Sequence, residues 1–370
     1  MSFEFLRGTR VLDLSQYVPG PYATQMLADL GADVLKIEPP GGDPMRGLEP
    51  RDADGISPFW KTINAGKTIV EIDLKSSAGA ALFAELVGRA DVLLESYRPD
   101  VMRRLGFGAA QLQALNTQLI HAALTGYGAT GPWADRSGHD VNYMAIAGGL
   151  AASGTAATPV TSMPPVADFA SGLQAALTIV AALLGRRSTG RGATLDLSLA
   201  ETVLGWQSMS LTLAARGAAP QRAAALLNGG AAFYHLYCCA DGRFVSLGAI
   251  ERKFWRNFCV AVDRPDWIAR QADAMPQTAL IAELSALLAT RDAAAWESLL
   301  GPGDCCFAIL LDATEVTGHP QIAARGLVHE VGDDQPRREV GFPARIDQAS
   351  PSPRIAVRRI TLEQAAAFWR

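Results

Sequence analysis

Hydrophobic and polar positions follow two alternating patterns over roughly the first 200 residues. Short apolar runs typical of buried strands are separated by stretches in which apolar residues recur with the spacing of a helix. We predict strands at residues 10–14, 31–38, 68–74, 91–96, 119–124 and 193–199, and helices at residues 22–30, 77–89, 101–105, 109–115 and 169–184. Because strands and helices alternate, the pattern predicts a doubly wound α/β domain on a parallel sheet.

The pattern changes after a long predicted helix at residues 201–215. Residues 216–228 are rich in alanine and lack aromatic side chains, as expected of a connecting segment. Beyond them we predict a hairpin at residues 233–247, helices at 252–262, 278–288, 293–300, 321–325 and 362–369, and strand-like stretches at 327–331 and 338–340. We therefore divide the chain into a large domain (1–200), a connecting helix and linker (201–228), a smaller α+β domain (229–320) and a C-terminal segment (321–370).

The predicted sheet also indicates where a ligand binds. In such sheets ligands bind at the carboxyl ends of the strands, which here are followed by residues 15–21, 38–45, 96–98 and 125–132. No Gly-x-Gly-x-x-Gly follows the first strand and no Walker sequence is present. The sequence therefore supports neither a dinucleotide nor a nucleoside-triphosphate site.

Composition and charge exclude several classes of protein. With 49% hydrophobic and 19% charged residues among 370, and a net charge of −4, the chain has a globular composition and no basic field for nucleic acid. The longest apolar run, residues 173–184, is shorter than the roughly 18 residues of a membrane span, so we expect a buried helix and no membrane insertion. Residues 1–7 lack a secretory signal, and five cysteines fit neither a disulfide framework nor a metal site. We expect a cytoplasmic protein without a metal.

Candidate chemistry gathers in residues 137–143, which follow the Gly- and Pro-rich loop after the fifth strand. His139 is the candidate there because an imidazole, with a pKa of about 6.5, takes and returns protons at neutral pH. Asp168 directly precedes a predicted helix, so its simplest role is that of an N-cap kept ionised by the helix dipole. A carboxylate facing an imidazole across a substrate could invert a carbon centre, and N–H groups at the helix start could accept a developing negative oxygen.

A set of short segments spread over nearly the whole chain carries a family resemblance. They are Gly-Ala-Asp-Val-Leu-Lys-Ile-Glu (31–38), Asp-Leu-Lys-Ser (73–76), Ala-Asp-Val-Leu-Leu-Glu (90–95), Tyr-Arg-Pro (97–99), Thr-Gly-Tyr-Gly (125–128), Gly-His-Asp (138–140), Ala-Asp-Phe (167–169), Gly-Gly (229–230), Ala-Asp-Gly-Arg (240–243) and Gly-Ala-Ile-Glu (248–251). With them the chain resembles the α-methylacyl-CoA racemases of the family III CoA transferase superfamily. The resemblance implies a Rossmann-like large domain, a small domain, a C-terminal part that returns to the large domain, and an interlocked homodimer.

The resemblance also implies an activity. The aspartate matching Asp168 is shared by racemases and transferases, whereas His139 and Glu251 match the racemase subset. His139 and Asp168 would then stand on opposite faces of the α-carbon of an acyl-CoA thioester, and Glu251 would orient and charge-stabilise His139. By itself, Glu251 is a solvated glutamate that opens a helix. No prosthetic group is expected, since coenzyme A enters as part of the substrate.

Residues matching the coenzyme A site lie in or near the loops at the strand ends. By resemblance they are Lys36, Asn64, Lys67, Arg98, Arg104, Gly126, Tyr127, Gly128 and Tyr143. The chain departs from the family at Pro39, where an arginine is frequent and Arg46 could substitute, at Asn228, where aspartate is usual, and at Arg252-Lys253, where the racemases tend to Pro-Gln. These departures leave the acyl group open.

Three alternatives stay open beside the racemase. In a family III CoA transferase Asp168 would be a nucleophile that forms an aspartyl anhydride. Such enzymes carry a glycine-rich run in the small domain, and only Gly229-Gly230 is found here, which favours the racemase. A non-catalytic acyl-CoA-binding protein would not need the three proton-handling residues, and a serine hydrolase would need a Gly-x-Ser-x-Gly elbow, which is missing.

Overall fold

The computed structural model describes residues 3–332 and 335–370, which form two compact units. The first contains Met1–Ala147, Met163–Trp206 and His319–Arg370, and the second contains Gly148–Ser162 and Gln207–Gly318. The division expected from the sequence keeps residues 148–162 in the large domain, whereas the structure groups Gly148–Ser162 with the second unit.

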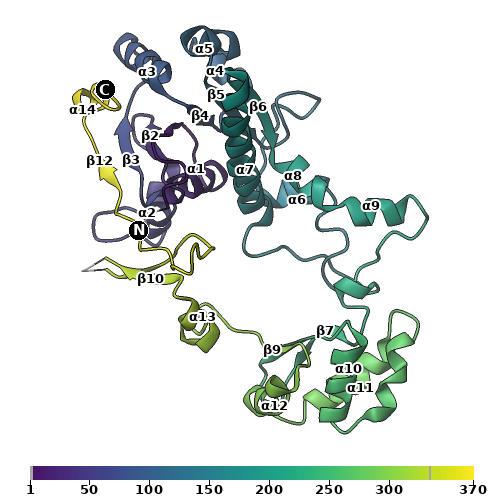
Figure 1. Cartoon of the computed structure of the whole chain (residues 1–370). Helices are drawn as coiled ribbons and strands as arrows, with labels where there is room; N and C mark the ends of the chain where they lie inside the picture. The colour runs from purple at the N-terminus through teal and green to yellow at the C-terminus, as the bar shows by residue number, and fades with distance from the viewer. Residues whose placement is uncertain (1–2, 333–334) are drawn as a thin grey trace. The chain divides into compact units, whose positions relative to one another are not determined.

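The first unit is built on a seven-stranded parallel sheet (Figure 1). Its order is β12-β3-β2-β1-β4-β5-β6, and every neighbouring pair is parallel. The strands are β1 (Arg10–Asp13), β2 (Asp33–Glu38), β3 (Thr68–Glu71), β4 (Val92–Glu95), β5 (Ile120–Thr125), β6 (Ala193–Ser198) and β12 (Arg358–Arg359). The predicted parallel α/β fold is confirmed, and β1 and β4 flank the point where the strand order reverses.

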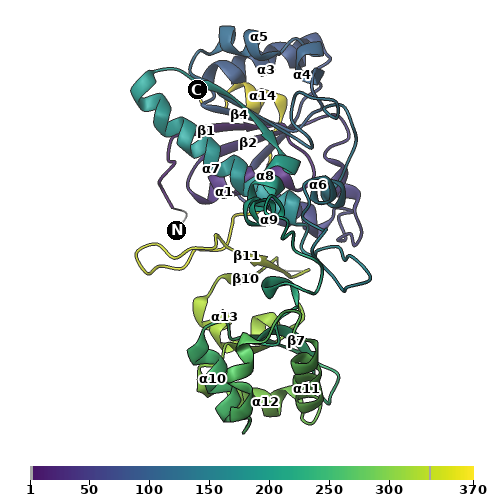
Figure 2. The same ribbon diagram turned by 90° about the vertical axis from the view of Figure 1, so that its right-hand side faces the viewer.

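Helices cover both faces of this sheet (Figures 1 and 2). On one face α1 (Pro19–Asp29) and α7 (Val166–Thr189) pack against each other and against the strands. On the other, α3 (Ser77–Arg89), α5 (Ala109–Leu115) and α14 (Leu362–Ala366) share one hydrophobic core with the strands, formed by side chains such as Leu12, Leu93, Phe83 and Leu112. Burial on both faces explains why the strands read as continuous apolar runs. The unit also contains the short helices α2 (Pro58–Asn64), α4 (Val101–Arg104), α6 (Asp140–Ile146) and α13 (Pro320–Arg325), and the hairpin β10 (Val328–Val331) and β11 (Arg337–Val340).

Helix α7 is longer than the sequence pattern indicates. The prediction covers residues 169–184, whereas the helix spans the 24 residues Val166–Thr189 and ends at Gly190, whose positive φ of 66° suits glycine. By length and composition alone this helix could cross a membrane. Its small residues Ala175 and Ala176 and its Ile179 are buried among the other elements of the first unit, as expected of a core helix. The single helix predicted at residues 201–215 is two helices, α8 (Leu199–Trp206) and α9 (Ser208–Ala214).

The second unit has its own small sheet and aromatic core. Strands β7 (Tyr234–Cys238) and β8 (Phe244–Gly248) form the predicted antiparallel hairpin, and the unpredicted β9 (Phe307–Ile309) adds a third strand. Helices α10 (Arg252–Ala261), α11 (Thr278–Leu288) and α12 (Ala293–Leu300) surround it. Its core is centred on the fully or almost fully buried side chains of Trp255, Trp267, Trp296, Phe258 and Tyr237.

Candidate active site

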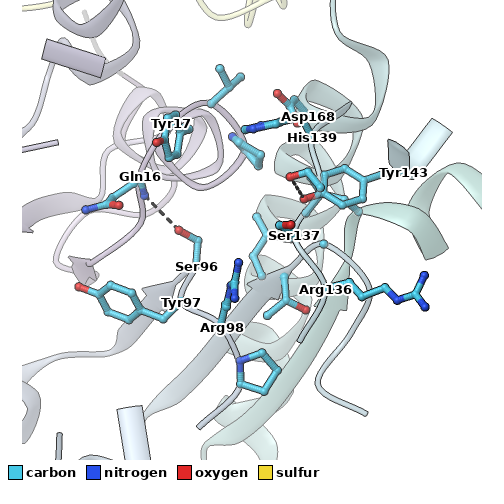
Figure 3. Close-up of a pocket in the computed structure, with 18 of the residues that line it drawn as sticks. Gln16, Tyr17, Ser96, Tyr97, Arg98, Arg136, Ser137, His139, Tyr143 and Asp168 are labelled. Carbon is cyan, nitrogen blue, oxygen red and sulfur yellow. Dashed lines mark hydrogen bonds between the residues drawn. The ribbon is translucent and has the colours of Figure 1, made fainter. Parts of the chain in front are cut away.

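A cavity of about 460 Å³ opens in the first unit at the carboxyl ends of β1 and β4 (Figure 3). The strand order reverses between these two strands, and this is where ligands bind in doubly wound sheets. Its walls include the loop after β1, the loop after β4 and the stretch from the end of β5 to α6, and Met45, Leu48, Asp168 and Leu199 also line it. The polar residues that line it are Gln16, Tyr17, Ser96, Tyr97, Arg98, Thr125, Arg136, Ser137, His139, Tyr143 and Asp168.

His139 lies at the rim of this cavity, directly before α6. Its backbone is extended and its N–H donates to the side-chain oxygen of Asn142 at 3.0 Å, while its carbonyl accepts from the Asn142 N–H at 2.8 Å. The first turn of α6 is therefore capped through the backbone of His139 and the side chain of Asn142. The imidazole is exposed and is left for chemistry in the cavity.

Tyr143 holds the loop that carries His139. Its hydroxyl donates to the carbonyl of Gly138 at 2.5 Å, and its ring packs edge-on against Tyr127. A Cβ at Gly126 would lie 2.5 Å from the Tyr143 ring, and one at Gly138 would lie 2.8 Å from it. Both glycines are thus required by the close approach of this ring. Burial raises the pKa of Tyr143 to about 12, so it stays a neutral hydrogen-bond donor.

Asp168 faces the same cavity from the first turn of α7, two residues after the first helical residue, Val166. The predicted N-cap role is wrong, because α7 begins earlier and Pro165 occupies the cap. Asp140 connects the two helices: its carboxylate accepts from the backbone N–H of Asp168 at 3.1 Å. In Figure 3 the carboxylate of Asp168 and the imidazole of His139 lie side by side.

Burial raises the pKa of Asp168 to about 6. The negative charge of Asp140 raises this pKa further, and only His139 lowers it. The helix dipole, expected to keep Asp168 ionised, therefore does not hold its pKa low, since desolvation and a like charge outweigh the dipole. A carboxyl group with a pKa of about 6 and an imidazole can each hold or release a proton near neutral pH.

The charge of Asp140 can be tested separately from its hydrogen bond. Replacing Asp140 with asparagine keeps a side-chain oxygen for the Asp168 N–H but removes the negative charge. We expect the pKa of Asp168 to fall from about 6 toward its ordinary value of 3.8. Titration of the Asp168 carboxyl carbon by ¹³C NMR measures this. An unchanged titration would show that burial alone sets the pKa.

The raised pKa also predicts a stability effect. The protonated form of Asp168 is favoured in the fold, so its stabilising contribution is present below about pH 3.8 and is lost as the pH rises through about 6. Above that pH the ionised carboxylate costs roughly 2–3 kcal/mol. Asp168→Asn should therefore melt at a higher temperature than wild type at pH 8, with a smaller difference at pH 4.5. Calorimetry tests this, with the exposed Asp135→Asn as control; equal gains at both pH values would contradict it.

Comparison with known proteins shows the family to which the chain with this cavity belongs. The family model for CoA-transferase family III matches residues 6–356. The chain belongs to CoA-transferase family III. It is 33% identical over 344 residues to human alpha-methylacyl-CoA racemase, covering 90% of this chain and 85% of that protein, and 33% identical to acetyl-CoA:oxalate CoA-transferase of Acetobacter aceti, covering 88% and 85%. A solved CAIB/BAIF family protein from Brucella suis superposes with a TM-score of 0.84 at 27% identity, covering 98% of this chain and 97% of that chain.

This family III protein brings part of its predicted coenzyme A site to the cavity. Arg98, Gly126 and Tyr143 line it. The Arg98 side chain lines the cavity and forms no ion pair or hydrogen bond with the residues that the structure describes, so it can meet a phosphate. Tyr127 and Gly128 follow Gly126 without lining the cavity, and Arg104 lies exposed on α4 outside it.

Lys36, Asn64 and Lys67 are placed elsewhere. All three side chains are buried, and the two ammonium groups pair with aspartates inside the fold instead of reaching the cavity. The direct contact with coenzyme A that the family resemblance implies for these residues does not match this placement, because a resemblance in sequence does not show which side chains are exposed. Arg46 does not replace the missing arginine at Pro39 either: it pairs with Glu38 at 2.7 Å and stacks on Trp60.

Glu251 belongs to the second unit, where it is the exposed N-cap of α10 without a side-chain capping bond. Its role toward His139 stays a prediction. Within residues 3–332 and 335–370, no group of three or more His, Cys, Asp or Glu side chains is arranged to hold a metal ion.

Three contributors to the site, Asp140, Gln16 and Tyr17, are not evident from the sequence. Local turn chemistry favours a role for Asp140 in its own turn, whereas its carboxylate bonds to Asp168 across 28 positions. The loop after β1 is a predicted ligand loop, but no signal in the sequence marks Gln16 and Tyr17 as cavity residues. The positive φ of Tyr17, 62°, is a conformation that sequence does not reveal for a non-glycine residue.

Proposed function

We propose that this chain is an acyl-CoA racemase that inverts the 2-methyl centre of a 2-methylacyl-CoA thioester. The observation that carries the proposal is a carboxyl group with a pKa of about 6, Asp168, facing one cavity with the imidazole of His139. An imidazole and a carboxyl group can each act as a general acid or a general base toward a carbon placed between them. A reaction that must run both ways, such as racemisation, uses such a pair well.

In the proposed reaction one of the two groups removes the α-proton and leaves an enolate. The other group delivers its proton to the same carbon on the opposite face, and the next turnover runs with the roles exchanged. The enolate oxygen needs stabilisation, and the amide N–H of Asp168 is already engaged by Asp140. Coenzyme A is part of the substrate, and no further cofactor enters.

A CoA transferase is the second candidate, and sequence identity to known relatives supports it as strongly as it supports the racemase. Relatives named as racemases and as transferases are equally identical to this chain. In a transferase Asp168 would attack the thioester carbonyl carbon and release the CoA thiolate, which leaves a mixed aspartyl anhydride. The thiolate would then attack the aspartyl carbonyl and release the first acid, and the aspartyl thioester so formed would pass its CoA to a second acid through a second anhydride. This chemistry needs an ionised Asp168 but assigns no role to His139.

One experiment separates the two candidates. The protein is incubated in deuterated water with a single stereoisomer of a 2-methylacyl-CoA and no acceptor acid, and the product is followed by NMR and chiral chromatography. A racemase incorporates deuterium at the α-carbon and scrambles the centre. If neither occurs, but CoA moves to an added free acid, the racemase proposal is wrong and the transferase is right.

We infer that the protein works as an interlocked homodimer in a reducing compartment, the cytoplasm. The dimer is supported by apolar side chains left exposed on three helices: Leu173, Leu177 and Leu184 on α7, Trp206 on α8, and Met209 and Leu211 on α9. Large exposed apolar surfaces mark interaction sites. All five cysteines are free, which suits a reducing compartment. Sedimentation as a monomer at micromolar concentration would refute the dimer.

A further inference from the structure

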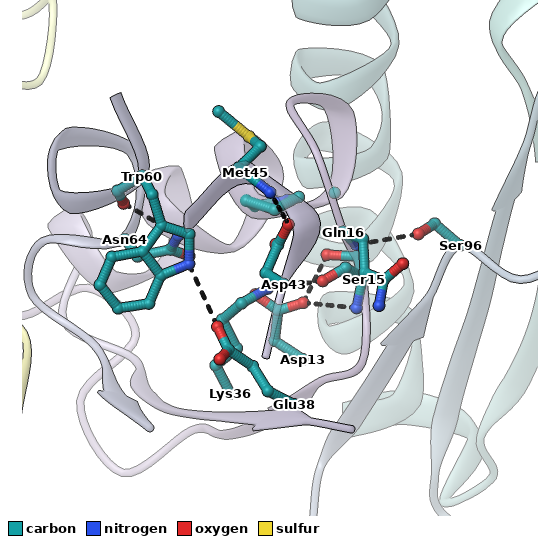
Figure 4. Close-up of polar contacts among 12 residues, drawn as sticks. Asp13, Ser15, Gln16, Lys36, Glu38, Asp43, Met45, Trp60, Asn64 and Ser96 are labelled. Atoms are coloured by element: carbon teal, nitrogen blue, oxygen red, sulfur yellow. Dashed lines mark hydrogen bonds and ion pairs between the residues drawn. The ribbon is translucent and has the colours of Figure 1, made fainter. Parts of the chain in front are cut away.

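Four ionisable side chains lie buried beneath one wall of the cavity: Asp13, Lys36, Asp43 and Lys67, called here the Asp13 cluster. Figure 4 shows Asp13, Lys36 and Asp43. Asp13 and Lys36 are 0% exposed, Asp43 is 1% and Lys67 is 2% exposed. Removing an ion from water is costly unless its partners replace the water completely. Such a cluster is therefore a poor way to stabilise a core, and its bonds indicate another use.

Lys67 uses all three of its N–H donors inside the fold. It donates to the carboxylate of Asp13 at 3.2 Å, to the side-chain oxygen of Asn64 at 3.0 Å and to the carbonyl of Pro21 at 2.8 Å. These acceptors lie on β1, α2 and α1 respectively. One ammonium group thus joins three elements below the cavity.

The other bonds of the cluster converge on Ser15. One carboxylate oxygen of Asp13 accepts from both the backbone N–H of Ser15, at 2.9 Å, and its hydroxyl. Lys36 donates to the carbonyl of Ser15 and forms an ion pair with Asp43 at 3.4 Å. Ser15 is therefore held at its N–H, its hydroxyl and its carbonyl by two oppositely charged groups.

Ser15 is followed immediately by cavity residues. Gln16 and Tyr17 line the cavity, and the N–H of Gln16 donates to the hydroxyl of Ser96 at 3.1 Å, which joins the loops after β1 and β4. Tyr17 has a φ of 62°, in the left-handed region that a non-glycine residue occupies only when its surroundings impose it. On the other side of the cluster, Asp43 accepts from the N–H of Met45 at 2.9 Å, and Met45 also lines the cavity.

We propose that the Asp13 cluster is a positioning device for the thioester cavity. It fixes residues 15–19 and the Met45 segment in the conformation that receives the ligand, and it does so through Ser15 and the Met45 N–H without touching the ligand. The inference rests on the proposed function to the extent that the cavity binds a CoA thioester. It assigns Lys36 and Lys67 to the wall rather than to the phosphates.

The positioning of the loop after β1 should depend on pH, because the charge of Lys67 does. Burial and the positive charge of Lys36 lower the pKa of Lys67 to about 8, against the opposing charges of Asp13 and Asp43. These are the charged groups that face it, from β1, β2 and the segment before Met45, while α1 and α2 present only the Pro21 carbonyl and Asn64. Above about pH 8 the ion pair with Asp13 is lost, and the loop after β1 should loosen.

The test is calorimetric titration of the full-length protein with propionyl-CoA at pH 7 and pH 9. Ser15→Ala removes one bond to Asp13 and no cavity side chain; its dissociation constant at pH 7 should rise about fivefold. Wild type should bind several-fold more weakly at pH 9 than at pH 7. The double variant Asp13→Asn, Lys67→Met removes both charges of one pair, and its already weakened binding should not change between the two pH values.

A matched control is Arg354→Met, which removes another largely buried ion pair of the same unit, Arg354 with Asp29 at 2.7 Å, away from the cavity. It should bind as wild type does and keep the pH dependence. Wild-type affinity in Ser15→Ala, or an unchanged pH dependence in the double variant, would overturn the positioning role alone. If wild type itself does not bind propionyl-CoA, the proposed function fails with it, whereas binding without racemisation leaves the positioning role intact.

Discussion

Replacing His139 with alanine is expected to reduce the inversion of a 2-methylacyl-CoA by about a thousandfold, because one of the two proton-transfer groups is lost. The side chain is exposed at the cavity and caps α6 only through its backbone, so the fold should not change. Asp168 can still remove and return a proton on its own face. We therefore expect one stereoisomer to keep exchanging its α-proton for deuterium without inversion.

The measurement is deuterium incorporation and chirality for each stereoisomer separately. Affinity for the thioester, measured by calorimetry, should stay within about threefold of wild type, since His139 acts on the α-carbon and not on the coenzyme. Full inversion in the variant would show that His139 is not one of the two groups. Complete CoA transfer to an added acid with unchanged rate would instead favour the transferase.

Replacing Asp168 with alanine is expected to have the larger effect, a loss of roughly three to four orders of magnitude in turnover. The carboxyl group is required by both candidate functions, as an acid and base or as a nucleophile. In the racemase the variant should exchange only the stereoisomer whose α-proton faces His139, the mirror image of the His139 result. In the transferase it should do nothing at all.

Asp168→Asn provides the matched control for this prediction. It keeps the size of the side chain and leaves the bond from the Asp168 N–H to Asp140 in place, since that bond uses the backbone. Equal losses in the alanine and asparagine variants identify the missing group as the carboxyl. If either variant turns over at the wild-type rate, Asp168 takes no part in the reaction, and its pKa of about 6 has no bearing on catalysis.

The parallel sheet could be predicted because the apolar pattern of each strand and helix is a property of its own short segment. Strands buried on both faces must be apolar throughout, and the connecting helices must be apolar at helical spacing, so the five strands and most of the helices within residues 10–125 are evident without tertiary information. The sequence pattern missed α2 and α6, gave α7 less than its full length and merged α8 and α9 into one helix. The ends of α7 lie beyond its apolar run, where only its packing in the first unit and the Gly190 C-cap set the limits.

The site could be predicted less completely, for an electrostatic reason. His139 and Asp168 could be named from their residue types and family motifs, and the structure places both at one cavity. That Asp168 holds its proton up to a pH near 6 follows from burial and from Asp140, neither of which its neighbours in sequence reveal. Burial also could not be predicted for Lys36 and Lys67. The family resemblance implies that they contact coenzyme A, whereas the structure shows them as buried ions.

Sequence alone therefore determined the class of fold, the order of its elements and the identity of the groups that can move a proton, because periodicity and residue chemistry are local properties. Only the tertiary structure decided which charges are removed from water, which of them meet, and which loop they hold at the cavity. Solvation and Coulomb interactions depend on distance in space, and residues such as Asp13 and Lys67, 54 positions apart, become partners only once the sheet has formed.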